Sequence, residues 1–453
     1  MILLKRRRLV IWLVRAYLKK WGKTILLFFF LGLIAFFLLR VFLSYISTKL
    51  PFVQKETIGI VGVYTSDNLP EQIGSKVGRG LTKIGEDGLP KPDLSGGWEI
   101  KDNGKTYIFR IKKGLTFSDG SELNSNSIHY NFLNVKEERP DKYTIVFKLK
   151  DNYAPFLVTV SKPVFKNNSI GSGEYEIRDI KLNGDFIQSV DLVSAKNSYD
   201  IISYQIYPSE QALKNAYVLG EVKEAFGLTS LDYKETTLDK FKNTKVDKVL
   251  NKYLLVAIFY NNQDPVLSEK RLRQALTYAI PNKFVGGETN RAPYSDSTWI
   301  NQEAASTYLQ DLEHSKLLLS ESESATKSAT TKLTITTLAK YENVANEVKK
   351  SWQKIGIDAS IKTTESLPDK FQIFLGDFRV SKDPDQYTLW HSAQENNITR
   401  YKNLRIDKLL EDGRKTADFN ERQKIYYDFQ KYLLDDSPAS FLYLPYTYQV
   451  RRK

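Results

Sequence analysis

An unbroken apolar run near the N-terminus constrains the fold of this chain more than any other feature. Residues 25–39 are all apolar, and Arg40 followed by Val41-Phe42-Leu43 extends the run to nineteen residues. About 20 such residues in a helix cross the hydrocarbon core of a bilayer. Arg40 lies near the outer end, where its long side chain can reach the headgroups. The run predicts one transmembrane helix over residues 24–45.

Basic residues cluster around this run and predict its orientation. Of the 66 Lys and Arg residues, ten lie in residues 1–50 together with no acidic residue, which leaves 56 basic against 53 acidic residues in 51–453. The net charge of +13 therefore belongs to the N-terminus, and we expect no nucleic-acid partner. The positive-inside rule predicts that residues 1–23 form a basic cytoplasmic or interfacial segment, and that residues from about 46 to 453 are extracytoplasmic.

The sequence offers no motif for metal binding or catalysis. No small-x-small site follows the apolar run, so we expect an uncleaved anchor rather than a removed signal peptide. There is no cysteine, which excludes disulfides and lipid attachment through a thiol. His129, His314 and His391 are far apart in sequence, and neither a G-x-S-x-G elbow nor a P-loop is present. We expect no catalytic residue, no metal and no cofactor.

The first half of the exported part reads mostly as β structure with short connections. Residues 56–64 predict a strand, and residues 105–112 and 143–150 alternate apolar and polar side chains as strands do. Between them, residues 125–133 predict a short helix. A hairpin is expected around Asn183-Gly184, because this pair suits a tight two-residue turn.

The second half changes to a mixed pattern. Residues 253–260 predict an apolar strand, Ser268 is expected to cap a helix that Pro281 closes, and residues 320–332 predict a polar surface loop. A last strand is expected over residues 440–450, in which Pro445 suits a sheet edge.

The segment in between alternates strands with a helix. Residues 333–338 predict a strand, residues 343–356 a helix ending at Gly356, and residues 357–362 and 371–375 two further strands. A β-α-β-β order of this kind predicts a partly parallel α/β sheet.

Two opposite charges follow strand ends in this region. Asp377 comes just after the strand at 371–375, and Lys340 follows the strand at 333–338. In open α/β sheets ligands sit outside the carboxyl ends of the strands. Asp377 and Lys340 there would complement the amine and the carboxylate of a zwitterion, with Phe374 and Phe378 excluding water. The alternative is that Asp377 caps a loop or pairs with Arg379 or Lys382, and that Lys340 is solvated.

From about residue 56 onward, the sequence resembles a known family. Residues 88–132 match a signature of a tryptophan-containing strand, a hairpin and an F-x-D-G turn, and residues 259–280 and 401–444 follow in family order. The family is solute-binding protein family 5, the extracytoplasmic peptide- and nickel-binding proteins of ABC importers. The resemblance implies an α/β, two-lobed periplasmic-binding-protein type II fold. Its accessory lobe is expected to be reduced, because the region after residue 132 is abbreviated.

The resemblance also implies roles for single residues. Residues 374–387 look like the family's W-x-x-D segment followed by Asp-Pro, with Phe374 at the tryptophan position and Gly376 before the aspartate. In peptide-binding members that aspartate holds the ligand's amino terminus, which falls on Asp377. Dipeptide-binding members hold the carboxyl terminus with an arginine, and Lys340 is the nearest cation here. The further predicted ligand contacts, for which core packing is the alternative, are Trp390, Tyr64 and Tyr260.

The expected domain organisation follows from the resemblance. Lobe I takes residues 51–255 with the accessory subdomain at about 89–165, lobe II takes residues 256–436, and residues 437–453 return as a strand to lobe I. Such a monomeric ectodomain would capture di- or oligopeptides between its lobes and deliver them to ABC permease subunits with their ATPase. The alternatives are a tethered receptor or sensor of the same fold, a non-peptide solute, and, third, an anchored hydrolase.

Overall fold

The computed structural model describes residues 2–49, 54–166, 169–300, 308–322 and 333–453. The expected loop at 320–332 lies mostly outside these residues. The chain divides into two compact units, one of Met1–Lys55 with Asn197–Ile201 and one of Glu56–Lys196 with Ile202–Lys453.

The first unit is dominated by one long helix, α1 (Ile2–Lys49). Within α1, residues Lys19–Arg40 are long and apolar enough to cross a membrane, a property that signal sequences near an N-terminus share. The helix contains the segment for which the sequence predicted a span.

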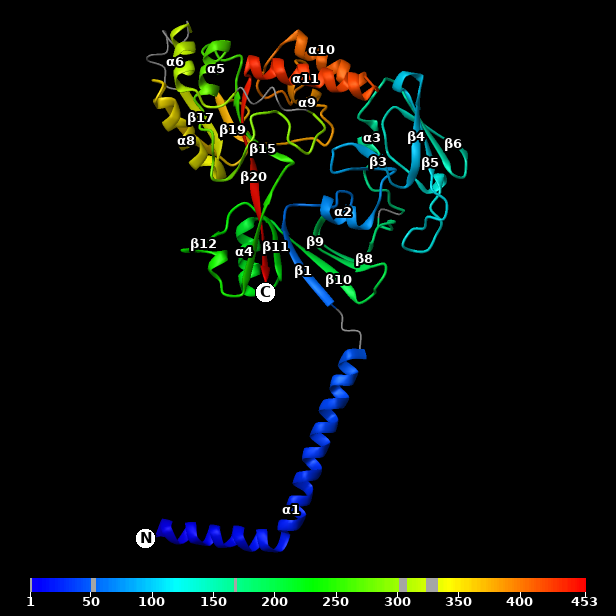
Figure 1. Ribbon diagram of the computed structural model, residues 1–453, viewed down its shortest axis with the longest axis vertical. Helices are drawn as coiled ribbons and strands as arrows, with labels where there is room; N and C mark the ends of the chain where they lie inside the picture. Colours follow the sequence, from blue (N-terminus) through cyan, green and yellow to red (C-terminus); the bar gives the residue numbers. More distant parts are fainter. Residues whose placement is uncertain (1, 50–53, 167–168, 301–307, 323–332) are drawn as a thin grey trace. The chain divides into compact units, whose positions relative to one another are not determined.

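A large mixed sheet organises the second unit (Figure 1). Along its main path the strand order is β18-β17-β19-β15-β20-β11-β1-β10-β9-β8, and β14 and β16 both pair with β20. In chain order the strands are β1 (Gln54–Val61), β8 (Tyr175–Asn183), β9 (Phe186–Ser194), β10 (Asp200–Tyr207), β11 (Glu224–Leu228), β14 (Thr244–Leu250), β15 (Leu254–Tyr260), β16 (Gly287–Thr289), β17 (Leu333–Leu338), β18 (Ala359–Thr364), β19 (Ile373–Arg379) and β20 (Ala439–Arg452). The predicted hairpin is confirmed as β8 and β9, with Gly184 in the left-handed region at φ 59°.

The partly parallel sheet predicted for the second half is confirmed. Strand β17 pairs in parallel with both β18 and β19, and α8 (Glu342–Gln353) connects β17 to β18. Gly356 at φ 87° follows this helix, as expected. The register places Thr337 of β17 beside Leu375 of β19. The carboxyl ends of these two strands therefore lie next to each other.

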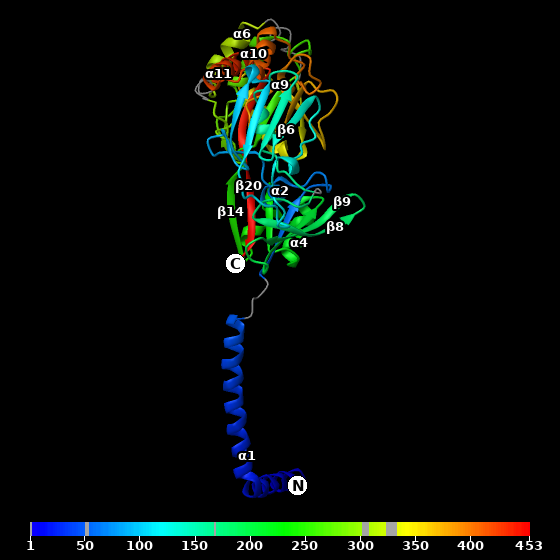
Figure 2. The same cartoon turned by 90° about the vertical axis from the view of Figure 1, so that its right-hand side faces the viewer.

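The expectation that Pro445 lies at a sheet edge is wrong. Strand β20 runs through the interior of the sheet and pairs on its two sides with other strands (Figure 2). Its ladder with β15 ends at Tyr443, and its ladder with β14 begins at Tyr446. Pro445 lies between these two ladders and opposite Gly287 of β16, and its carbonyl accepts from the N–H of Asn251. Its missing N–H interrupts neither the ladder with β15 nor the ladder with β14.

A separate four-stranded sheet forms the accessory part. Its order is β4 (Ser95–Lys101), β5 (Thr106–Ile111), β7 (Thr144–Leu149) and β6 (Val135–Asp141). The helix expected over residues 125–133 is wrong, because the structure has only a 3-10 turn at Ser125–Ser127. Asn124 and Ser127 cap each other around this turn, and Ile128 is already extended. The four remaining short strands are β2 (Thr82–Ile84), β3 (Pro90–Pro92), β12 (Asp232–Tyr233) and β13 (Thr236–Thr237).

The described helices besides α1 and α8 are α2 (Glu71–Val77), α3 (Phe156–Thr159), α4 (Glu210–Leu219), α5 (Lys270–Tyr278), α6 (Leu312–Ser320), α9 (Tyr387–Trp390), α10 (Leu404–Lys415) and α11 (Phe419–Asp436). Phe156 of α3 packs in the core of the accessory sheet. The predicted cap of α5 is wrong: Glu269 is its N-cap, and the hydroxyl of Ser268 donates to the carbonyl of Pro265 instead.

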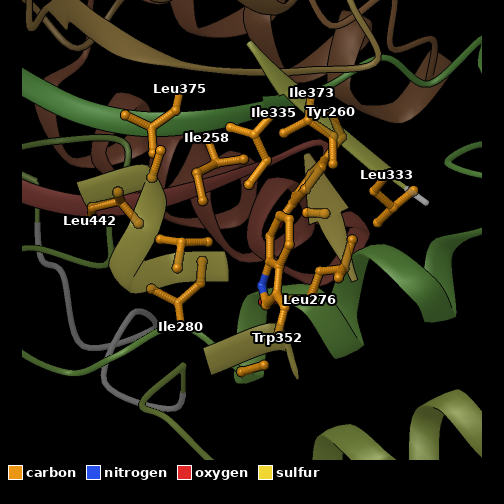
Figure 3. Packing of buried hydrophobic residues seen from close by; sticks show 14 of the residues in the cluster. Ile258, Tyr260, Leu276, Ile280, Leu333, Ile335, Trp352, Ile373, Leu375 and Leu442 are labelled. Carbon is orange, nitrogen blue, oxygen red and sulfur yellow. The ribbon is translucent and has the colours of Figure 1, made fainter. Parts of the chain in front are cut away.

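The sheet around β15 and β19 separates two hydrophobic clusters. Figure 3 shows the first, in which Trp352 of α8 packs against strand residues and donates from Nε1 to the carbonyl of Leu276 at 3.0 Å. The second cluster lies on the opposite face and contains Phe259, Phe374 and Trp390. Successive residues of β19 alternate between the two clusters, which decides where each side chain of the candidate site points.

Candidate functional site

The carboxylate of Asp377 lies on the face of β19 that carries the first cluster. Ile373 and Leu375 pack in that cluster, and Asp377 follows them at the same strand period. The register between β17 and β19 brings Asp377 beside the 3-10 turn Ala339–Tyr341, which connects β17 to α8. The sequence predicted this adjacency of two strand ends, and the structure confirms it.

Two side chains of that turn bind the same oxygen of Asp377. The ammonium of Lys340 donates to Oδ2 at 2.5 Å, and the hydroxyl of Tyr341 donates to Oδ2 at 2.5 Å. The Lys340 ammonium also lies 4.8 Å from the centre of the Tyr341 ring, within the range of a cation–π contact. The alternative pairing with Lys382 does not occur, since Lys382 binds Glu71 at 2.6 Å.

The environment of this carboxylate is half-buried and aromatic. The side chain of Asp377 is 18% exposed and that of Lys340 is 43% exposed. Burial, reinforced by the charge of Asp377, raises the pKa of the Tyr341 hydroxyl far above its usual value, so this phenol remains a hydrogen-bond donor. Burial likewise raises the pKa of Tyr443, with smaller contributions from Glu347 and Asp377.

Sequence reasoning missed Tyr341 and Tyr443 as neighbours of the carboxylate. Tyr443 of β20 pairs with Val256 of β15, which in turn pairs with Asp377. The position of Tyr443 near Asp377 cannot be predicted from local sequence, because it depends on the pairing of three strands that are far apart in the chain. Tyr341 could have been predicted, since it follows Lys340 directly in sequence.

The expectation that Phe374 and Phe378 flank the carboxylate is wrong. Both rings pack with the second cluster, on the opposite face of β19. The Phe374 ring is 4% exposed and stacks on Phe259 with ring centroids 6.3 Å apart. Gly376 lies under it, and a Cβ there would come within 2.5 Å of the Phe374 ring. Strand alternation is the cause, because residues an odd number of positions apart face opposite ways.

The other predicted site residues lie apart from Asp377. Trp390 is buried in the second cluster and donates from Nε1 to Gln386 at 2.8 Å. Tyr260 is fully buried in the first cluster, its hydroxyl bonds Ser440 at 2.8 Å, and burial raises its pKa to about 12. Tyr64 is half-buried against a third cluster around Ile187. Ligand contacts by Phe374, Gly376, Trp390, Tyr260 and Tyr64 stay predictions.

A cavity of about 250 Å³ lies elsewhere, between the accessory sheet and α11. Tyr107, Trp299 and Phe419 line it together with a buried ion pair. The guanidinium of Arg422 donates to both oxygens of Asp383, from Nη1 to Oδ2 at 2.8 Å and from Nη2 to Oδ1 at 2.6 Å. These charges satisfy each other, so the cavity offers mainly apolar walls.

The fold is shared with solved solute-binding proteins. The ABC transporter substrate binding protein CtaP from Listeria monocytogenes matches with a TM-score of 0.73 and 23% identity, over 88% of this chain and 94% of that chain. NikZ from Campylobacter jejuni in complex with Ni(L-His) matches with a TM-score of 0.67 and 18% identity, over 88% and 94%. The chain therefore has the mixed α/β fold of these proteins.

The sequence comparison gives the family. The bacterial extracellular solute-binding proteins, family 5 Middle, match residues 90–399, which is more than half of the chain. The chain belongs to this family, as the resemblance implied. A curated relative is the oligopeptide-binding protein AppA of Bacillus subtilis strain 168, which is 24% identical over 467 residues, covering 84% of this chain and 83% of that protein.

Proposed function

We propose that this chain is the membrane-anchored substrate-binding protein of an ABC importer for peptides. Asp377 takes the ligand's amino terminus, and Lys340 takes its carboxyl terminus. The observation that carries the proposal is the contact of Lys340 and Asp377 at adjoining strand ends, at 2.5 Å and half-buried. A carboxylate in such surroundings binds an ammonium more strongly than one in water does.

The carboxylate of Asp377 can also accept a hydrogen bond from a ligand. Both contacts with protein side chains use Oδ2. Within the described residues, the structure gives Oδ1 no hydrogen-bond partner, and a carboxylate oxygen accepts two bonds. A ligand ammonium can therefore bind Oδ1 without displacing Tyr341.

The peptide would be captured and released by closing and opening of two lobes. Residues 51–255 with 437–453 form one lobe and residues 256–436 the other, and closure by hinge motion encloses the peptide. The backbone of an extended peptide pairs with strand edges, which gives affinity with little side-chain selectivity. The closed monomer docks on permease subunits, whose ATPase supplies the energy, and the chain itself catalyses no reaction.

The anchor keeps the binding domain at the membrane. Residues 1–23 stay cytoplasmic, residues 24–45 span the bilayer, and residues from about 46 onward lie outside. The apolar segment Lys19–Arg40 of α1 supports this arrangement, as does the concentration of cations before it. A tethered receptor would use the same parts without a permease.

A non-peptide solute is the second candidate, because a relative by fold was solved with Ni(L-His). Among the residues that the structure describes, there is no group of three or more His, Asp and Glu side chains that could hold a metal ion. A peptide is therefore the better supported ligand.

The test is to identify what the protein carries when it is purified. The full chain is extracted in mild detergent, washed, and denatured in acid, and the released molecules are measured by mass spectrometry. We expect peptides that disappear from the Asp377→Asn variant and remain in the Asp369→Asn control, which changes an exposed carboxylate just before β19. A released non-peptide solute, or no released molecule combined with no binding of added peptides, would contradict the proposal.

A further inference from the structure

The cavity of about 250 Å³ between the accessory sheet and α11 takes no part in the proposed peptide site, because none of the residues predicted to bind the peptide lines it. Two parts of the chain that are far apart in sequence form its walls (Figure 1). Ile100 of β4 and Leu157 of α3 come from the accessory side, and Trp299 and Phe419 come from the other side. Pockets for small molecules occur preferentially where two parts of a protein meet.

We infer that this cavity is a second binding site, which takes a small, neutral, planar aromatic molecule of about the size of indole. The inference goes beyond peptide binding and does not depend on it. It rests on three properties of the cavity: walls that are already held in place, charges that are already paired, and a volume that suits one or two fused rings.

Neighbouring groups hold the aromatic walls in place. The ring of Tyr107 lies 4.8 Å from that of Phe156, and its hydroxyl donates to the carbonyl of Tyr153 at 3.0 Å. On the other side, the ring of Trp299 lies 4.9 Å from that of Phe419. A ligand therefore enters between rings that need little further ordering, which lowers the entropic cost of binding.

The charges in the wall favour a neutral ligand. The side chains of Arg422 and Asp383 are 7% and 6% exposed and form an ion pair, and the Nε of Arg422 donates to the carbonyl of Gly413 at 2.7 Å. A ligand that carried a charge would bring an unpaired ion into this mostly apolar space, at a high cost. The guanidinium already lies 5.5 Å from the centre of the Trp299 ring, and it can make the same kind of contact with the π face of a neutral ligand.

The volume of the cavity limits the size of the ligand. An engineered apolar cavity of about 150 Å³ in another protein stays dry and binds benzene. At about 250 Å³, this cavity has room for a single substituted ring or for two fused rings. Phe419 at its edge is 40% exposed, so the cavity can be entered from solvent.

A bound molecule would strengthen the contact between the accessory part and the helices of the second half. That contact already includes a hydrogen bond from the N–H of Ala154 to the carbonyl of Arg414 at 2.8 Å. A ligand that touches both walls binds only the folded protein and raises its unfolding temperature by mass action. A mere packing gap predicts neither saturable binding nor such a shift.

The test is fluorine NMR of a fluorinated indole, titrated into the full chain in detergent. We expect a saturable bound signal that is separate from the signal of indole in micelles. Val158→Phe places a ring in the cavity and should weaken this binding about tenfold or more. Val285→Phe makes the same substitution at a side chain that is 90% exposed, and it should bind like the unmodified protein.

Two further measurements test the class of ligand and the place where it binds. Benzyl alcohol, benzylamine and benzoate are similar in size but differ in charge, and the alcohol should displace the fluorinated indole at concentrations about tenfold or more below those of the two ions. The dipeptide Ala-Phe, a probe of the Asp377 site, should displace none of it. Indole should raise the thermal unfolding midpoint of the unmodified protein and of Val285→Phe, but not that of Val158→Phe.

Three results would overturn the inference: no saturable signal, a signal that Val158→Phe leaves unchanged, or displacement by Ala-Phe, which would place indole in the peptide site. Displacement by either ion as effective as that by the alcohol would overturn the neutral class of ligand. If Val158→Phe does not fold, Phe419→Ala decides, because it removes one exposed wall and should weaken indole binding several-fold at a normal unfolding midpoint. Absence of peptide binding would leave each of these expectations unchanged.

Discussion

Asp377 and Phe374 lie on opposite faces of β19, although only two residues separate them in sequence. The carboxylate meets Lys340 and Tyr341 on one face, and the ring stacks on Phe259 on the other. The resemblance implies that Phe374 takes the position of the family tryptophan, which would suggest a shared role. The structure separates the two: the charge belongs to the candidate site, and the ring belongs to the core.

Phe374→Ala is therefore expected to affect stability rather than ligand binding. Loss of a buried ring costs about 3–5 kcal/mol of unfolding free energy. The dissociation constant of the folded variant for Ala-Phe should stay within about twofold of the original, since the ring faces away from Asp377. Denaturant unfolding and calorimetry measure the two quantities. Lost affinity at normal stability would place the ring at the ligand instead.

Removing one partner of the buried pair of Asp383 and Arg422 is expected to lower the free energy of unfolding strongly, whereas replacing both partners by apolar residues should lower it little. Arg422→Met leaves an unpaired carboxylate and should cost about 3–5 kcal/mol, while adding Asp383→Leu should recover most of this loss. The exposed pair of Lys408 and Asp412 at 2.7 Å is the control, and Lys408→Met should cost under about 1 kcal/mol. Urea unfolding of the set measures the difference. Equal losses at both pairs would contradict this account.

Glu224 is expected to make the protein less stable as the pH rises. Burial raises the pKa of its carboxyl above the usual 4.5, with Arg451 opposing the shift. The folded state therefore holds the proton more tightly than the unfolded state. The stability from this group is present below about pH 4.5 and is lost as the pH rises through the folded pKa.

Glu224→Gln removes this ionisation. We expect a higher unfolding midpoint than that of the unmodified protein at pH 7.5, and a difference that shrinks toward pH 4. Thermal scans across this range measure it. A variant that is less stable at pH 7.5 would mean that the attraction between the charges of Glu224 and Arg451 outweighs the cost of burying the Glu224 carboxylate.

The orientation of the anchor can be measured because the chain has no cysteine. Single substitutions Lys20→Cys and Ser66→Cys place one thiol on each side of the expected span. On intact cells, a membrane-impermeant maleimide should label Ser66→Cys only, and it should label both after the membrane is broken. The mass of the labelled chain reports whether residues 1–45 remain. Labelling of Lys20→Cys on intact cells would contradict a cytoplasmic N-terminus.

The local sequence pattern predicted the strands around Asp377 and which of them are adjacent, but not which residues of other strands lie next to them. The apolar runs at β15, β17 and β19 and the glycine after α8 were sufficient to predict a partly parallel sheet with Asp377 near Lys340. Tyr443 could not be predicted, because its position depends on the pairing of β20 with β15. Pro445 was misjudged for the same reason, since it lies where β20 changes partners. The turn at Ser125–Ser127 reflects local capping that outweighed a weak helical pattern.

The most direct test of the central claim is calorimetric titration of Ala-Phe into the full chain, beside the Asp377→Asn variant. A charge-assisted hydrogen bond contributes about 2 kcal/mol, so the variant should bind about 30-fold more weakly with an unchanged unfolding midpoint. The Asp369→Asn control should bind like the unmodified protein. Equal affinity of the Asp377→Asn variant and the unmodified protein would contradict the claim that this carboxylate holds the ligand's amine.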